Sequence, residues 1–323
     1  MKRIFLYVLL VFQTQGLFGD KLELMSSRSI PVGELPSSIA IAPDGKIAYV
    51  ANFGSNTVTP INLITHTPLQ PIPVGSCPSS IAISSKEQMA YVVNSLDSSI
   101  TPISLTTNTA LASFSVGYAP NKIIVSSSGT MAYVLNQGES DPNHPTNGYL
   151  ISLDLATHAL GKEIPVGNSP QAIAMTPNQR FAYVVNLGDG NVTPIDLKKQ
   201  IPHPPISADQ YPIAIGITPN GKTAYIADLL GNCIIPIILS DRSVHPPIPV
   251  GKGPRDIAIS SDGEVAYVAN SNDNTVSVIE LETRHLKAVI PVGKGPACLK
   301  ISPDGKTLYV LNELSNDVTV VFI

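Results

Sequence analysis

Charged and amide side chains stand directly after a proline that recurs along the chain in a Gly-x-x-Pro pattern. The residues of this kind at those positions are Asn121, Lys122, Gln171, Arg255 and Asp256. Lys300 adds an ammonium group shortly after another such proline, Pro296. Basic groups that converge on one point bind carboxylates and phosphates. This set therefore predicts a site for a small anion or an acidic peptide, provided that the fold brings the segments together.

The residue types used for nucleophilic and metal chemistry are few and scattered. The three cysteines form no C-x-x-C pair and no C-x-x-C-H motif, so neither zinc, dithiol redox chemistry nor c-type haem is indicated. An odd number of cysteines leaves at least one thiol free, and a disulfide between the other two stays open. The six histidines lie far apart along the chain. We therefore predict no catalytic residue, no metal ligand and no cofactor.

A tetrad of the form Tyr-[Val/Ile]-x-[Asn/Asp] recurs seven times and indicates how these residues are positioned. It begins at Tyr49, Tyr91, Tyr133, Tyr183, Tyr225, Tyr267 and Tyr309. The spacing is 42 residues in every interval except one, which is 50 residues long. A fixed period of this length is the signature of a repeat architecture. Seven of the eleven tyrosines are thereby assigned to structure.

Each period is typical of four short strands, as the sixth copy illustrates. Strands are predicted over residues 255–260, 264–270, 274–281 and 286–293, with turns such as Ser261-Asp262-Gly263 between them. No segment has a sustained 3.6-residue period, so helix should be nearly absent. Radial repetition buries sheets that are apolar on both faces. The predicted fold class is therefore all-β, a seven-bladed β-propeller of four-stranded antiparallel blades.

The phase of the repeat predicts that the ring closes. The last copy ends after its third strand, at residues 316–323, whereas residues 24–33 resemble a fourth strand without a blade. The N-terminal strand should therefore complete the C-terminal blade. An open solenoid is the alternative, but it needs polar capping repeats, which neither end of the repeat array provides.

The tetrads, the Pro-Asp-Gly turns at residues 43–45 and 303–305 and the Pro-Val-Gly-x-x-Pro junctions resemble those of the YVTN-repeat β-propeller family. The resemblance covers residues 24–323, which form the expected propeller domain. It implies an exported or surface-associated bacterial or archaeal protein, and it implies no particular reaction. Related propellers include lactonases, a streptogramin-type lyase and the haem-carrying domain of cytochrome-type nitrite reductases.

Residues 1–19 are typical of a signal peptide, with an N-terminal apolar strand as the alternative. Lys2 and Arg3 precede an apolar run at residues 4–12, which is too short to span a bilayer, and a polar stretch follows. We expect export to the periplasm, the medium or the cell surface, no transmembrane segment in the mature chain, and a monomer. The formal net charge of −4 without a basic cluster argues against nucleic-acid binding.

The 50-residue interval contains an eight-residue insertion in the third blade, within residues 137–145. Glu139, Asp141 and His144 lie in it and are candidates for contact with a partner. The connections between blades share one face with the connections from second to third strands, around the mouth of the central channel. The insertion should project from that same mouth face, where insertions often mark binding.

These features predict a binding or scaffolding propeller that recognises a protein, a peptide or a small anionic ligand at the channel-mouth face, without enzymatic activity. The alternative is a lactonase-like hydrolase or lyase whose site lies at the central channel. Several carboxylate or histidine side chains that converge on one point of the channel would favour the enzyme.

Overall fold

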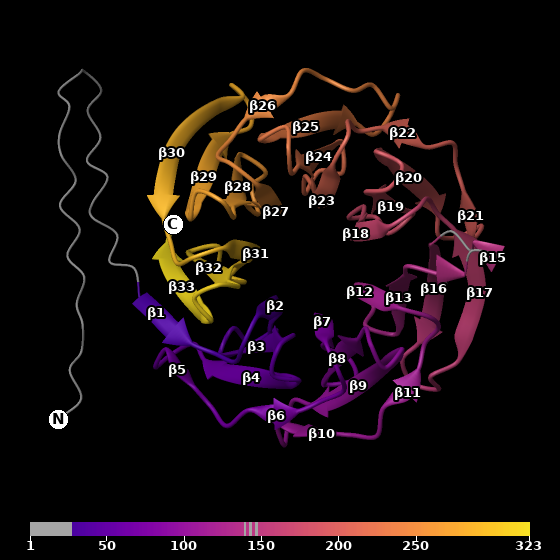
Figure 1. Cartoon of the computed structure of the whole chain (residues 1–323), viewed down its shortest axis with the longest axis vertical. Helices are drawn as coiled ribbons and strands as arrows, with labels where there is room; N and C mark the ends of the chain where they lie inside the picture. Colours follow the sequence, from indigo (N-terminus) through magenta and orange to yellow (C-terminus); the bar gives the residue numbers. More distant parts are fainter. Residues whose placement is uncertain (1–27, 139, 142–143, 146–147) are drawn as a thin grey trace.

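The computed structural model describes residues 28–138, 140–141, 144–145 and 148–323. This part of the chain forms seven antiparallel blades of β-strands around a central channel, with no helix in it (Figure 1). None of its residues therefore belongs to a helix that could cross a membrane. The predicted fold class is confirmed. The predicted signal peptide, residues 1–19, lies outside the described residues.

The first three strands of each blade have nearly constant length. The innermost strands are β2 (Pro36–Ile41), β7 (Pro78–Ser84), β12 (Pro120–Val125), β18 (Pro170–Met175), β23 (Pro212–Ile217), β27 (Pro254–Ile259) and β31 (Pro296–Ile301). The second strands are β3 (Ile47–Asn52), β8 (Met89–Asn94), β13 (Met131–Asn136), β19 (Phe181–Asn186), β24 (Thr223–Asp228), β28 (Val265–Asn270) and β32 (Thr307–Asn312). The third strands are β4 (Thr57–Asn62), β9 (Ser99–Ser104), β16 (Tyr149–Asp154), β20 (Asn191–Asp196), β25 (Cys233–Ile238), β29 (Thr275–Glu280) and β33 (Asp317–Phe322).

The outermost strands are less regular. They are continuous in the third and sixth blades, as β17 (Leu160–Pro165) and β30 (His285–Pro291). Elsewhere they are shorter: β5 (Thr67–Pro68) with β6 (Ile72–Pro73), β10 (Thr109–Ala110) with β11 (Phe114–Ser115), β21 (Ile201–Pro202) with β22 (Ile206–Ser207), and β26 (Ile248–Pro249). In the first, fourth and fifth blades prolines interrupt these strands, because proline has no N–H for the ladder.

The ring closes as predicted. Strand β1 (Arg28–Pro31) pairs with β33 in antiparallel register, from Arg28 opposite Val320 to Pro31 opposite Asp317. Ile30 of β1 is 1% exposed and packs into the core between the last and first blades. The two ends of the propeller therefore share one sheet, which Figure 1 shows where β1 meets β33.

The tetrad tyrosines pack between blades, and the tetrad asparagines hold each blade together. Tyr49 is fully buried, and its hydroxyl donates to Asn108 Oδ1 of the next blade at 2.6 Å. Asn270 ends β28, and its Nδ2 donates to Thr275 Oγ1 at 3.1 Å and to Ser277 Oγ at 2.9 Å. Gly251 of the preceding junction lies against this amide, so closely that a Cβ there would be 2.6 Å from Asn270 Cγ.

This contact predicts a coupled pair of substitutions. Gly251→Ala should lower the free energy of unfolding by about 2 kcal/mol, because the added methyl overpacks the site against the Asn270 amide. In an Asn270→Ala background the same glycine substitution should cost much less, since the colliding amide is gone. Urea unfolding of the two single variants and the double variant measures the coupling. Strictly additive losses would contradict this account of the junction.

Candidate functional site

Every innermost strand begins with a β-bulge that determines which side chains reach the channel mouth. In the sixth blade Pro254 pairs with Asn270 and Asp256 with Ala269, so that Arg255 is skipped. The skipped residues of the seven blades are Ser37, Ser79, Asn121, Gln171, Ile213, Arg255 and Ala297. Bulges re-aim side chains and are common beside functional sites. We call these seven bulged residues the mouth ring; Asn121, Gln171 and Arg255 of the predicted site belong to it.

Several residues of the mouth ring bond to the next blade. The hydroxyl of Ser37 donates to the Pro78 carbonyl at 2.7 Å. Asn121 Nδ2 donates to the Pro170 carbonyl at 2.5 Å, while its Oδ1 is buried without a partner among the described residues. These side chains connect blades, and their freedom to contact a ligand is reduced accordingly.

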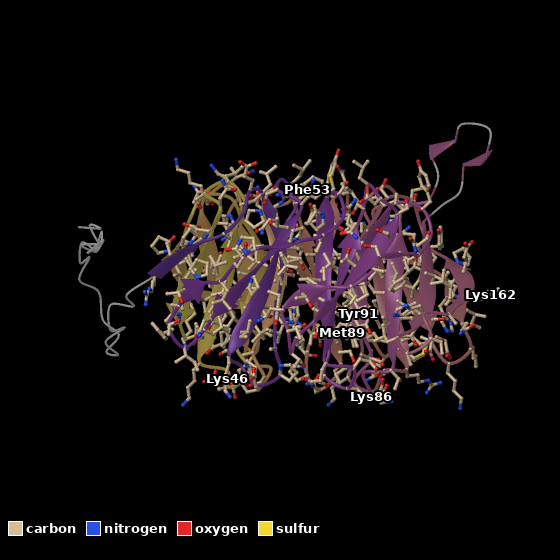
Figure 2. All side chains as sticks on the ribbon, turned by 90° about the horizontal axis from the view of Figure 1, so that it is seen from below. Lys46, Phe53, Lys86, Met89, Tyr91 and Lys162 are labelled. Carbon is tan, nitrogen blue, oxygen red and sulfur yellow. The ribbon has the colours of Figure 1, made fainter. Side chains whose placement is uncertain are left out.

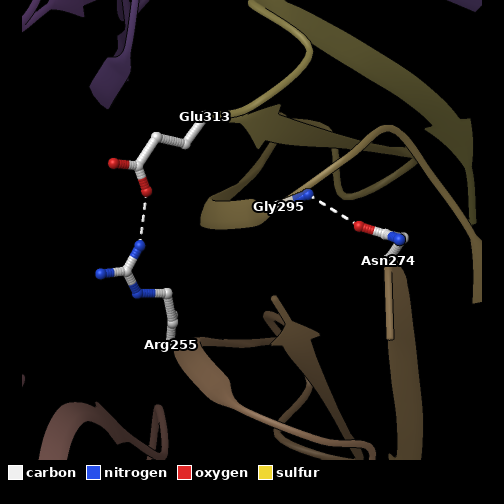
Figure 3. Close-up of polar contacts among 4 residues, drawn as sticks. All are labelled: Arg255, Asn274, Gly295 and Glu313. Atoms are coloured by element: carbon white, nitrogen blue, oxygen red, sulfur yellow. Dashed lines mark hydrogen bonds and ion pairs between the residues drawn. The ribbon is translucent and has the colours of Figure 1, made fainter. Parts of the chain in front are cut away.

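Arg255 also spans two blades. Its Nη1 lies 2.5 Å from Glu313 Oε2 in an ion pair that joins the sixth blade to the seventh (Figure 3). Beside it, the Gly295 N–H donates to Asn274 Oδ1 at 2.9 Å across the same blade boundary. The positive charge of Arg255 is thus balanced by Glu313, and the mouth is less basic than the sequence predicted.

The next residue of each inner strand forms a second ring, the throat ring. Its members are Ser38, Ser80, Lys122, Ala172, Ala214, Asp256 and Cys298. Ser38 Oγ accepts the Ile81 N–H of the next blade at 3.3 Å. Asp256 Oδ2 accepts the Leu299 N–H of the next blade at 2.7 Å. The throat ring therefore stitches the inner edges of neighbouring blades together.

Asp256, Lys122 and Cys298 interact within the throat ring. Burial raises the pKa of Asp256, and the Leu299 N–H, the charge of Lys122, the Ile257 N–H and the Cys298 thiol oppose that rise only in part. Burial, reinforced by the charge of Asp256, raises the pKa of the Cys298 thiol to about 12, although Lys122 acts the other way. Cys298 is therefore a protonated donor to Asp256 at neutral pH and not a thiolate nucleophile.

A cavity of about 420 Å³ lies in the channel below the throat ring. Its wall consists mainly of aliphatic side chains from β2, β7 and β12, with Met175 from β18 and Lys300 from β31. We call it the lower chamber. Its volume is in the range of small-molecule sites.

Lys122 and Lys300 differ from Arg255 in having no acceptor. Within the described ranges neither ammonium group forms a hydrogen bond or an ion pair. Lys122 projects from β12 and Lys300 from β31, on opposite sides of the channel (Figure 1). Two ammonium groups therefore line one channel, and the charge of Lys122 also acts on Asp256 across it.

The other predicted site residues are not gathered at this point. Gln171 belongs to the mouth ring and is half-buried. Asp141 and His144 pair in the hairpin of β14 (Ser140–Asp141) and β15 (His144–Pro145), which rises from the mouth face (Figure 2). Glu139 lies outside the described residues. Among the residues that are described, no three His, Cys, Asp or Glu side chains cluster as metal ligands.

The two faces of the disc differ in chemistry. Exposed apolar side chains occupy the turns between second and third strands on the mouth face, at Phe53, Leu96, Leu230 and Leu314. Lys46 and Lys86 lie on the opposite face, as their labels in Figure 2 show relative to Phe53. The mouth face therefore exposes apolar side chains alongside charged ones such as Lys252 and Lys294.

Sequence reasoning missed two residues of the site, Cys298 and Glu313. Cys298 is one of the three cysteines for which the sequence indicated no zinc, redox or haem chemistry, although it stands two residues after its junction proline, as Asp256 does. Glu313 follows a tetrad, at a position where other copies carry residues such as Phe53 or Ser95. The sequence shows that both residues differ from their counterparts in the other copies. It does not show their partners, Arg255 and Asp256, which lie in the preceding blade.

The profile of the family described as "Lactonase, 7-bladed beta-propeller" matches residues 109–290. Among solved structures, hydrazine synthase from Kuenenia stuttgartiensis superposes with a TM-score of 0.80 and 20% sequence identity. The match covers 90% of this chain and 96% of the other, and at this identity it shows the shared fold alone. No curated protein matches the sequence.

The raised pKa of Asp256 predicts a pH-dependent stability. The unfolded chain ionises this carboxyl in the ordinary aspartate range, so ionisation costs stability at neutral pH, and that cost disappears as the pH falls through the raised folded value. Relative to Asp256→Asn, the wild-type protein should therefore gain stability in urea unfolding as the pH falls from neutral toward the ordinary aspartate range.

A matched control has the opposite sign. Hydrogen bonds from the Ser260 hydroxyl and the Glu264 N–H lower the pKa of Asp262 on the protein surface. Relative to Asp262→Asn, the wild-type protein should gain nothing over the same pH range and lose stability at lower pH. The same trend for both aspartates would contradict the assignment at Asp256.

Proposed function

The chain belongs to the lactonase family of seven-bladed β-propellers, and we propose that it binds a small anionic ligand, with a carboxylate as its charged group, in the central channel. Within the family we assign it to the YVTN-repeat propellers, on the basis of its seven tetrads. The character of residues 1–19 supports a protein that acts outside the cytoplasm.

The observation that carries this proposal is the pair of ammonium groups, Lys122 and Lys300, in one channel that holds Asp256 as their nearest described counter-charge on the throat ring. Cations in a narrow space with low-dielectric walls attract anions and raise their local concentration. Arg255 contributes little to this attraction because Glu313 balances its charge.

The lower chamber supports a ligand that is larger than a simple ion. Its volume of about 420 Å³ leaves room for a small organic acid, whose carbon chain would contact the aliphatic side chains of the wall and also the polar groups exposed there. Lys300 adds an ammonium group to the chamber wall. The ligand class is therefore a small organic carboxylate that enters from the mouth face.

Hydrolysis of a lactone is the second candidate, and Asp256 is the observation that favours it. A carboxylate with a raised pKa can act as general base near neutral pH. It would take a proton from water while the water oxygen bonds to the lactone carbonyl carbon. The ring C–O bond would then break, and the proton would pass to the departing alkoxide, so that a hydroxy acid forms.

Binding ranks above hydrolysis because Asp256 stands without a second acid or base. Glu313, a carboxylate at the mouth, is held by Arg255. The Cys298 thiol is protonated and donates to Asp256. A single carboxylate that already accepts several hydrogen bonds is a poor general base.

The two candidates are separated with one ligand pair, octanoate and δ-octalactone. We expect octanoate to bind the wild-type protein in calorimetry and Lys122→Met to weaken it by about tenfold or more, because an ammonium contact to the carboxylate is lost. Asp256→Asn should bind octanoate at least as well, since a negative charge leaves the channel. Lys86→Met, on the opposite face, is the charge-matched control and should bind normally.

The measurement with δ-octalactone tests whether the protein is a hydrolase. We expect no release of hydroxy acid from δ-octalactone above the buffer rate. Turnover by the wild-type protein that disappears in Asp256→Asn would establish the hydrolase instead. Octanoate binding that Lys122→Met leaves unchanged would contradict the proposed site.

A further inference from the structure

The innermost strand of each blade is the edge of its sheet, so part of its backbone faces the channel. In the fourth blade the Thr176 N–H donates to the Phe181 carbonyl, which makes 176 and 181 a hydrogen-bonded pair. Such pairs alternate along an antiparallel ladder. Ile173 opposite Val184 is therefore a non-hydrogen-bonded pair, and the Ile173 N–H points away from β19 to the inner edge. The same register holds at Ile215 in the fifth blade.

Most inner-edge N–H groups at this level are capped by a side chain of the throat ring. Ser38 caps Ile81, Ser80 caps Ile123, and both hydrogen bonds are 3.3 Å long. The remaining caps involve Cys298 with Ile39, Asp256 Oδ2 with Leu299, and Asp256 Oδ1 with Ile257. Five of the seven blades therefore satisfy this donor from within the described part of the chain.

In the fourth and fifth blades no described side chain caps the inner-edge N–H at this level. In each case the capping side chain would come from the throat-ring residue of the preceding blade. For the Ile173 N–H of the fourth blade that residue is Lys122 of the third blade. For the Ile215 N–H of the fifth blade it is Ala172 of the fourth blade. An ammonium group has no acceptor, and an alanine lacks the oxygen atom that serine provides. The N–H groups of Ile173 and Ile215 are thus left without a side-chain acceptor among the described residues.

We propose that these two backbone N–H groups and the Lys122 ammonium form a cradle for the carboxylate of the ligand. Lys122, Ile173 and Ile215 lie on the consecutive strands β12, β18 and β23, side by side around the channel (Figure 1). An unsatisfied N–H in a low-dielectric site gains more from an anionic acceptor than from water. This inference rests on the proposed function and names the atoms that recognise the anion.

The charge balance of the cradle selects a monoanion. The cradle has one formal positive charge, on Lys122, which the carboxylate of Asp256 on β27 offsets in part. A phosphate dianion would place its second charge toward the carboxylate of Asp256, which is repulsive. A monocarboxylate matches the single ammonium and supplies two oxygen atoms for the two N–H donors.

The experiment supplies the missing acceptor from within the protein. Ala172→Ser places a hydroxyl oxygen on the fourth blade where it can accept the Ile215 N–H of the fifth blade, as Ser38 Oγ accepts the Ile81 N–H of the next blade. It should compete with the ligand and lower octanoate affinity by about tenfold. Ala214→Ser is the matched control. Its hydroxyl would face the Ile257 N–H of the next blade, which Asp256 Oδ1 already accepts. It should leave octanoate affinity unchanged.

Two further measurements make the result decisive. In ¹⁵N-resolved NMR, octanoate should shift the amide signals of Ile173 and Ile215 more than phosphate or chloride at equal ionic strength. Without ligand, Ala172→Ser should raise the melting temperature more than Ala214→Ser, because it satisfies a free donor. Equal melting temperatures, together with unmoved amide signals, would overturn the cradle.

Failure of the cradle is distinguishable from failure of the proposed function. Octanoate binding that Lys122→Met abolishes but Ala172→Ser preserves would overturn the cradle and leave anion binding at the channel intact. Absence of binding by every monocarboxylate would overturn both. A stronger response of the two amides to phosphate than to octanoate would overturn the assignment to a carboxylate.

Discussion

In six of the seven blades the architecture depends on the contact between the asparagine that ends the second strand and the glycine of the junction beside it. The amide of Asn52 donates to Thr57 and Thr59 of the third strand and accepts the Gly33 N–H of the junction. It thus connects three segments of one blade in a buried position. Only a residue without a Cβ fits against the amide, as the equivalent contacts of Gly75 and Gly251 also show. Because the junction is held there, the bulge that follows it has a defined place, and so do the mouth and throat rings.

The repeat was sufficient to predict the strands within each blade and the closure of the ring. The tetrads predicted the second strands, and the unmatched strand near Ile30 predicted the closing sheet with β33. The continuous fourth strand expected from the sixth copy did not carry over to blades whose outer segments contain several prolines, such as Pro202. The divergence after the junction prolines located the mouth ring, although the bulge that causes it is a property of strand pairing and cannot be seen in the sequence alone.

Contacts between blades were beyond reach of the sequence. Arg255 was expected to be a free cation, and its partner Glu313 belongs to the next blade. The sequence indicated no chemistry for Cys298, whereas its thiol donates to Asp256 of the blade before it. Such pairs depend on the angle and height at which adjacent sheets meet. A repeat pattern specifies the position of a residue within its blade, but not the side chain that it faces across the boundary.

Departure from symmetry then determines what the channel can do. A perfectly repeated throat ring of serines would cap the inner-edge N–H at its own level in every blade and leave none of these donors for a ligand. Lys122 and Ala172 break that ring on one side, while Asp256 caps two N–H groups on the other. The carboxylate of Asp256 is thereby engaged by backbone donors and by the Cys298 thiol, which limits its strength as a base. Donors left free on one side and a base occupied on the other favour recognition of an anion over catalysis.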